Sequence, residues 1–269
     1  MAFDLDTNIV TYLTGAATSG GAQTTTYESF GGYRSSTAFV NDSMENIFRR
    51  VDFTDAASGV TQYLCLWDEN ESATSTAYDY KRYFHRTAET TATTQVVGSG
   101  AVTVVANSIT GFDANNGYIK MISGATNEIM FYSSVNTTNN EFVVGAAGRG
   151  VRGSTAVTHA AGTSVQWYPW CDMISEQPNT TGGVQTIVDV ETAPALSGNA
   201  STTWYTPVYS STTDGFTNGV GINNSGVTDG EDLAAGEGVA FWYRFIVPPN
   251  TGVNASVDIA KTRKVAQTL

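Results

Sequence analysis

The sequence predicts an all-β fold: an antiparallel β-sandwich that is interrupted by a small inserted β-barrel or sandwich module and preceded by an extended N-terminal arm. Short apolar or alternating segments recur along the chain, and Gly, Asn, Asp and Ser separate them, as in antiparallel β proteins. No long segment carries the apolar period of an amphipathic helix. A chain of 269 residues is long enough to bury a complete core.

Residues 1–29 are predicted to form the arm. They show no sustained apolar period, and residues 14–26 have the Gly, Ser and Thr composition of a linker. We expect this arm to become ordered against a neighbouring subunit, and a free terminus is the alternative that the composition leaves open.

The sandwich is predicted to come from residues 30–90 and 168–269. In the first part, the apolar centre of residues 61–70 and the aromatic–polar alternation of residues 77–84 are typical of strands. In the second part, residues 239–247 form an apolar run that ends at two prolines, which cannot donate to a sheet ladder. Weaker signals predict a turn at residues 31–32 and strands at residues 51–53 and 256–265.

Residues 91–167 are predicted to form the inserted module. Five short apolar segments there alternate with Gly, Asn and Asp turns at near-regular spacing, which is typical of a small antiparallel barrel or sandwich. Such an insertion is tolerated where the two ends of a surface loop lie close together.

Composition and charge narrow the range of partners. Charged residues make up 14% of the chain, compared with about 25% in an average soluble protein. The 13 basic and 25 acidic residues give a net charge of −12, which repels phosphate and therefore argues against nucleic acid and anionic lipid as partners. No apolar run approaches the ~20 residues of a membrane span, and the first residues lack the pattern of a signal peptide. We therefore expect folding in a cytoplasm, without membrane insertion.

The two cysteines, Cys65 and Cys171, lie in aromatic segments and lack the spacing of a metal site. Their simplest interpretation is as buried small apolar side chains. A disulfide between them is the alternative if their two strands are neighbours, because disulfide geometry requires close Cα atoms.

A Gly-rich loop, FVVGAAGRGVRGSTAVTHAAGTSV, covers residues 142–165 and connects two predicted strands. It resembles a loop of small β modules in virion proteins of tailed bacteriophages, especially tail, baseplate and fibre components. The resemblance implies that this loop serves packing and assembly, and that His159 is a hydrogen-bonding residue that stabilises it. The loop and assembly candidates are Arg149, Gly150, Arg152, Gly153, His159 and Gly162.

Segments on both sides of the module are similar to a family of phage virion structural proteins. They are SFGGYRSST at residues 29–37, NIFRRV at 46–51, GVTQYLCLWDEN at 59–70 and LAAGEGVAFWYRFIVP at 233–248. Gln62 and Leu64 depart from the family, which has a Glu–Arg pair there, so a salt bridge at that place is in doubt. The resemblance implies a β-sandwich split by the module, without placing the protein on the head or the tail.

Candidate chemistry in the sequence is sparse. His159 lacks a local nucleophile and an orienting carboxylate, and no catalytic or phosphate-binding motif is present. Two acidic segments, residues 68–71 and 229–232, lack the ligand spacing of a calcium loop and are interpreted as surface turns. We therefore predict neither a cofactor nor a metal. One basic cluster stands out in the acidic chain and is interpreted as a contact with a neighbouring subunit, with a solvated strand end as the alternative: Lys81, Arg82, His85 and Arg86.

These observations predict a non-enzymatic structural protein of a tailed virus particle, assembled in the host cytoplasm and located on the virion exterior. It would be a head decoration (cement) protein or a tail or baseplate component, with other virion proteins and copies of itself as partners. A receptor- or glycan-binding module is the alternative, because Trp residues exposed beside Asn and Asp would form a sugar-stacking surface. A glycosidase would need two carboxylates across a cleft, and the spacing of the available glutamates pairs none of them: Glu128, Glu141, Glu176 and Glu191.

Overall fold

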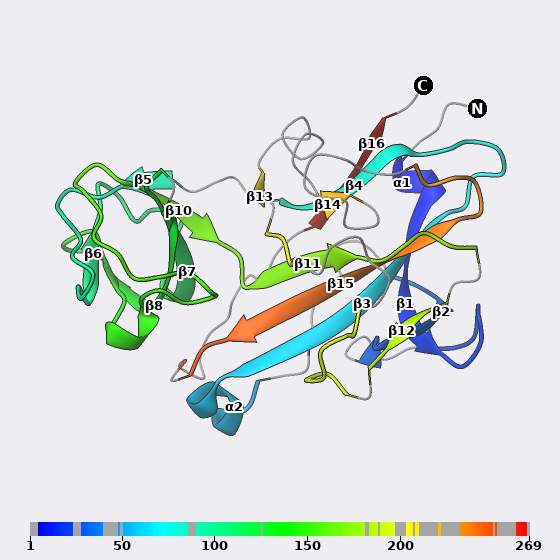
Figure 1. Cartoon of the computed structure of the whole chain (residues 1–269), viewed down its shortest axis with the longest axis horizontal. Coiled ribbons are helices and arrows are strands. Elements are labelled where there is room, and N and C mark those ends of the chain that lie inside the picture. Colours follow the sequence, from blue (N-terminus) through cyan, green and yellow to red (C-terminus); the bar gives the residue numbers. More distant parts are fainter. Residues whose placement is uncertain are drawn as a thin grey trace.

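The computed structural model confirms the all-β prediction (Figure 1). Its helices are short: α1 (Leu5–Asn8), α2 (Phe53–Ser58) and the 3-10 turn η2 (Ala146–Gly148). The structure describes residues 5–23, 28–39, 48, 51–85, 90–124, 126–180, 183–187, 189–196, 203–206, 208–209, 220–221, 232–249, 251 and 262–267.

The main sheet has six strands in the order β11-β15-β3-β1-β2-β12, and all of its pairings are antiparallel. Its centre is the long pair of β3 and β15, which runs in unbroken register from Val60 opposite Val247 to Glu69 opposite Gly238. The strands are β1 (Ile9–Ala16), β2 (Gly31–Ala38), β3 (Val60–Asn70), β11 (Cys171–Ser175), β12 (Gly183–Thr186) and β15 (Gly238–Val247).

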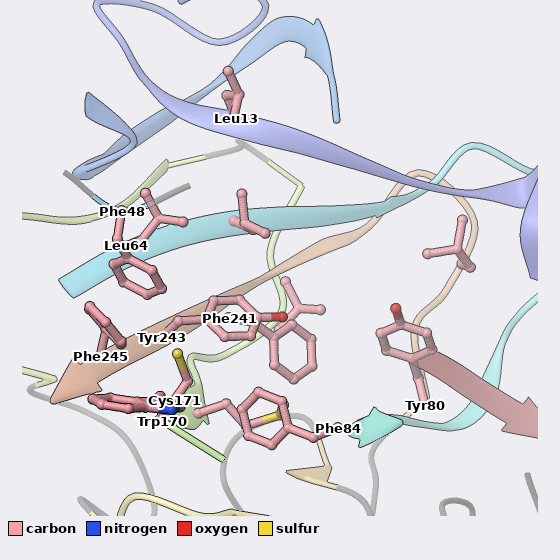
Figure 2. Packing of buried hydrophobic residues seen from close by; sticks show 14 of the residues in the cluster. Leu13, Phe48, Leu64, Tyr80, Phe84, Trp170, Cys171, Phe241, Tyr243 and Phe245 are labelled. Carbon is pink, nitrogen blue, oxygen red and sulfur yellow. The ribbon is translucent and has the colours of Figure 1, made fainter. Parts of the chain in front are cut away.

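A smaller sheet faces the main sheet and completes the sandwich. It has four strands, with β4 (Tyr78–His85) paired to β13 (Val208–Tyr209), β14 (Val220–Gly221) and β16 (Thr262–Gln267). Edge-to-face aromatic pairs join the two sheets: Tyr80 lies 6.2 Å from Phe241, and Phe84 lies 6.5 Å from Tyr243, measured between ring centroids. Figure 2 shows these rings between the strands.

The third sheet contains only strands from residues 90–168, in the order β5-β10-β7-β8-β9-β6. An antiparallel bridge between Thr93 and Ala106 joins its first and last strands, so the sheet closes into a small barrel. Thr90 is paired with Gln166, which means that the chain enters and leaves the barrel at one place. The strands are β5 (Thr90–Ala92), β6 (Thr103–Val105), β7 (Asn115–Ile122), β8 (Glu128–Asn136), β9 (Glu141–Val143) and β10 (Ser164–Tyr168).

Both faces of the main sheet are buried, because successive side chains of a strand point to opposite faces. In β3, Leu64 and Leu66 face the smaller sheet, and Cys65 and Trp67 belong to a second apolar cluster on the other face. The continuous apolar runs that predicted β3 and β15 therefore reflect strands covered on both sides. The barrel has its own core, formed by residues such as Ile119, Met130, Phe142, Val165 and Trp167.

The N-terminal residues differ from the predicted arm. Residues 9–16 form β1, which lies inside the main sheet between β3 and β2, with Ile9 and Leu13 in the core. Tyr12 faces the opposite side, so the strand has apolar residues on both faces and shows no simple alternation. This strand belongs to the sandwich and not to an appendage.

Two weaker local predictions were wrong. Residues 51–53 open no strand, because Asp52 and Asp55 form a capping box that begins helix α2: the Asp55 amide donates to the Asp52 side chain at 2.9 Å. Gly31 and Gly32 both have positive φ angles, but they begin β2 instead of forming a free turn. Among the described residues, no helix is long and apolar enough to cross a membrane.

Candidate functional site

The Gly-rich loop of residues 144–163 returns across one end of the barrel, and two of its glycines are sterically required. At Gly148, an added Cβ would lie 2.2 Å from the carbonyl oxygen of Phe131. Gly150 has a φ of +58°, and an added Cβ there would lie 2.6 Å from the amide nitrogen of Ala156. The loop is therefore packed tightly against its own barrel.

A buried carboxylate, that of Glu128, organises this loop. Arg149 donates to it through Nε at 2.6 Å and Nη2 at 2.9 Å, which is the two-bonded guanidinium–carboxylate geometry. The amides of Gly150 and Val157 donate at 3.0 and 3.1 Å, and His159 Nε2 lies 2.8 Å from the second oxygen. Glu128 and His159 are fully buried, so one carboxylate from β8 fixes three separate points of the loop.

Arg149 also reaches a second loop. Its Nη1 donates to the carbonyl oxygen of Gly98 at 2.6 Å and to that of Ala101 at 3.2 Å, and Nη2 donates to the Val157 carbonyl at 2.9 Å. The Glu128 cluster, which we define as Glu128, Arg149 and His159, thus connects the turn at residues 98–101 to the Gly-rich loop. A buried charge pair of this kind tolerates no missing partner.

Burial alone raises the pKa of Glu128, but the hydrogen bonds from Arg149, the Val157 amide, His159 and the Gly150 amide outweigh it and hold the pKa below its ordinary value. Glu128 is therefore an ionised acceptor, and the fitting tautomer of His159 carries its proton on Nε2.

Acid is expected to unfold the protein partly through this carboxylate. A carboxylate whose pKa is lower in the folded than in the unfolded protein stabilises the fold at pH values above its unfolded-state pKa. This contribution is lost as the pH falls from there through the folded-state pKa. The buried carboxylate of Asp68 acts with the same sign: burial raises its pKa, but Arg82 and its other partners outweigh burial and hold the pKa below its ordinary value. Unfolding free energy, measured by urea titration at a series of pH values, should fall below about pH 4. In Glu128→Gln this fall should be shallower, and an unchanged slope would contradict the assignment.

His159 and Glu128 form a His–carboxylate pair such as nucleophilic enzymes use, which the sequence alone did not reveal. However, both side chains are buried and cannot be reached from the surface. His159 has no exposed surface, its Nδ1 has no hydrogen-bond partner among the residues that the structure describes, and both oxygens of Glu128 are occupied by loop donors. The arrangement holds the loop together.

Arg152 lies at the junction of the barrel and the sandwich. Its side chain is 3% exposed, donates to the carbonyl oxygen of Pro169 at 2.6 Å and forms an ion pair with Asp172. Arg244 also pairs with Asp172, through Nε at 3.0 Å, and the Arg152 guanidinium lies 5.0 Å from the ring centroid of Tyr168. Arg149, Arg152 and His159 were predicted as loop or assembly candidates, and their buried side chains bind within the chain.

The other loop candidates are backbone positions. Gly153 and Gly162 have positive φ angles and open space where a Cβ would be, so they provide turns. The side chains of Arg149, Arg152 and His159 bind inside the protein, whereas Thr155 and Thr158 of the same loop are exposed.

The predicted basic contact cluster is not a surface feature where the structure describes it. Lys81 and Arg82 are only 1% and 3% exposed, because β4 is covered on both faces. Lys81 pairs with Asp79 at 2.9 Å, and Arg82 pairs with the buried Asp68 at 2.5 Å. His85 ends β4, and Arg86 lies outside the described residues.

Cys65 and Cys171 are both free and buried, so the disulfide alternative was wrong. Cys65 pairs with Trp242 of β15, Trp242 pairs with Ile174 of β11, and Cys171 pairs with Phe245. The two cysteines are thus two strands apart, about 10 Å across the sheet, which exceeds the Cα separation of a disulfide. They also belong to clusters on opposite faces of the sheet.

The thiols are expected to be unreactive in the folded protein. Burial raises the pKa of both, above all through loss of solvation, so the reactive thiolate is scarce. Titration with a chromogenic disulfide reagent should detect neither thiol natively and both after denaturation, with or without earlier oxidant treatment. Loss of titratable thiol after mild oxidation of the native protein would contradict this geometry.

The tryptophan residues mostly serve the core. Trp67, Trp167, Trp170 and Trp242 are at most 4% exposed, and Trp204 is half-buried. The Trp204 ring lies 5.7 Å from that of Tyr63 and is covered by the guanidinium of Arg244 at 4.7 Å. Core packing therefore explains most of the aromatic content that had suggested a sugar-binding surface.

The acidic segment at residues 68–71 is also not a surface turn. Asp68 and Asn70 are fully buried within β3, and Asn70 donates to the carbonyls of Ser75 and Leu233, both at 2.8 Å. Among the described residues, no group of three or more His, Cys, Asp or Glu side chains is placed to hold a metal ion. Residues 229–231 lie outside the described part.

Sequence reasoning found Arg149, Arg152 and His159 but missed their acidic partners, Glu128 and Asp172. A usable signal was present, because an acidic residue inside or beside an apolar strand needs a basic partner once it is buried. No protein-family model matches this chain, and no curated protein matches its sequence. The similarity to phage virion proteins therefore stays a prediction.

Proposed function

We propose that this chain is a non-enzymatic structural protein of a tailed virus particle, present in several copies on the virion exterior as a head decoration or a tail or baseplate component. The main observation that supports the proposal is that several arginine side chains are buried and paired within the chain. Arg82, Arg149 and Arg152 form ion pairs inside the protein, and these pairs hold loops and sheets in place.

The remaining surface is suited to contacts between proteins. Much of the chain consists of Thr, Ser, Asn and Gly, and charged residues are few. An interface can therefore form with a small desolvation cost for charged side chains. Two rigid bodies, a sandwich and a barrel, are joined through Arg152 and Asp172, which gives the molecule a fixed outline. A fixed outline and a neutral surface are properties that a repeated building block needs.

Particle labelling tests this function. Antibody raised against the purified chain, with gold-conjugated secondary antibody, is applied to purified particles of the virus that encodes it. Gold is expected at regular exterior positions on the head or the tail, and its location decides between decoration and baseplate. Detection in infected-cell lysate, together with absence from washed particles by mass spectrometry, would overturn the proposal.

A glycan-binding role is the second candidate, favoured by the half-buried Trp204 beside Tyr63 and Arg244. An aromatic ring with a neighbouring guanidinium can stack on a sugar and donate to its hydroxyl groups. Glycan-array binding that is lost in Trp204→Ala and retained in Phe53→Ala, which changes an exposed ring on α2, would support this role. An array without any binding would exclude the tested glycans as ligands.

A further inference from the structure

Apolar exposure is concentrated in one loop of the barrel. Four large apolar side chains are exposed in the described part of the chain, and two of them are Val96 and Val102, at 63% and 50%. They lie on either side of the turn at residues 98–101, where the Ala101 amide donates to the Gly98 carbonyl at 2.9 Å. The other two, Tyr33 and Phe53, belong to β2 and α2.

The surrounding segment carries no charge. Residues 90–112 contain no Asp, Glu, Lys, Arg or His, in a chain with a net charge of −12. Residues 145–147 are also uncharged and lie beside Val102, because the amides of Val144 and Gly145 both donate to its carbonyl, at 2.9 and 3.0 Å. We name residues 94–102 and 145–147 the loop face.

Hydrogen bonds from buried groups hold the loop face in place. Arg149 fixes both ends of the 98–101 turn through the carbonyls of Gly98 and Ala101, and Glu128 fixes Arg149. Val97 and His159 exchange backbone hydrogen bonds at 2.9 Å, which fastens the segment that carries Val96. A surface ordered before contact loses little conformational entropy on binding.

We propose that the loop face is a self-association surface whose occupant is a second copy of this chain. Two copies with the same negative charge repel each other over most of their surfaces, and this repulsion is smallest where a face has no ionisable side chain. Exposed Val96 and Val102 supply the apolar contact, and the Glu128 cluster supplies its rigidity. The inference rests on the proposed function, in which several copies lie side by side.

The contact is weak in solution and strengthens with salt. Two valines and a turn cover less than the roughly 800 Å² per partner of a standard interface, so the particle must add further contacts. Salt screens the repulsion between the acidic copies but leaves an apolar contact intact, so dimerisation should tighten from low to high ionic strength. A contact made by ion pairs would show the opposite dependence.

Sedimentation equilibrium of the full chain, up to about 0.5 mM, tests the inference. The apparent mass of the wild type should rise with concentration, and more steeply at higher salt. In the double variant Val96→Asp/Val102→Asp, the dissociation constant should increase at least about tenfold, because each copy places carboxylates opposite its partner's. Phe53→Asp, which adds a charge at an even more exposed apolar position outside the loop face, should associate like the wild type.

Unchanged thermal unfolding of the variants confirms that they remain folded. A wild type that is monomeric at all concentrations, or an equal loss of association in Phe53→Asp, would overturn the inference. This failure is distinct from failure of the proposed function: a monomeric chain that still labels the particle keeps its structural role and has a different protein on the loop face.

Discussion

Replacing Asp68 with Ala is expected to destabilise the protein by about 3–5 kcal/mol, because it leaves the buried guanidinium of Arg82 without its counterion. Asp68 is fully buried and accepts from Arg82 through Nε and Nη2, both at 2.5 Å, from Tyr80 at 2.7 Å and from Thr11 at 2.6 Å. In the wild type, burial favours the neutral form of Arg82, but Asp68 holds its pKa above the ordinary value. Asp68→Ala removes this support, yet an arginine side chain stays protonated at neutral pH, so the buried cation cannot escape by losing its proton.

Guanidinium unfolding curves, followed by tryptophan fluorescence, measure the loss. The matched control is Arg34→Met, because Arg34 forms a partly exposed ion pair with Glu69, one position along β3, and such pairs contribute about 0–1 kcal/mol. The double variant Asp68→Leu/Arg82→Met removes both charges and should lose much less than the sum of the single variants. Additive losses would show that the two residues act separately.

The same pair shows why part of the structure could not be predicted from the sequence. Residues 77–84 were correctly interpreted as a strand, since aromatic and polar residues alternate there. Lys81 and Arg82, in the middle of this strand, were interpreted as part of a surface cluster, because local sequence does not reveal that β16, β13 and β14 flank the strand and that the main sheet covers it. The burial of these two residues depends on strands that are distant in the sequence and adjacent only in the folded protein.

The barrel was more predictable than the arm for a physical reason. Its strands are short and follow one another within residues 90–168, and the consecutive strands β7, β8 and β9 pair with each other, so turn residues and apolar spacing carry most of the information. Residues 9–16 instead pair with residues 66–70, a long-range contact that leaves no local period when both faces of the strand are covered. The Gly-rich loop falls between these cases: its tightness was predicted, but its carboxylate anchor, Glu128, was not.

Replacing Trp170 with Ala is expected to cost about 3–5 kcal/mol and to weaken the connection between barrel and sandwich. Trp170 is 1% exposed and lies directly after the barrel's last strand. Its ring centroid is 5.0 Å from that of Tyr118 and 5.8 Å from that of Phe131, both in the barrel, and 5.9 Å from that of Phe245 in the sandwich. Removing the indole therefore opens a cavity between the two bodies.

Calorimetry and limited proteolysis distinguish this effect from a general loss of stability. In Trp170→Ala, we expect the unfolding of barrel and sandwich to separate into two transitions, with faster cleavage near residues 168–170. Trp170→Phe is the matched control: within the described part of the chain the indole Nε1 has no hydrogen-bond partner, so this change removes volume without breaking a hydrogen bond described there and should keep a single transition. A single, equally cooperative transition in Trp170→Ala would mean that the polar contacts between the two bodies, such as Arg152 with Asp172 and Tyr118 with the Ile246 carbonyl, couple them without the indole.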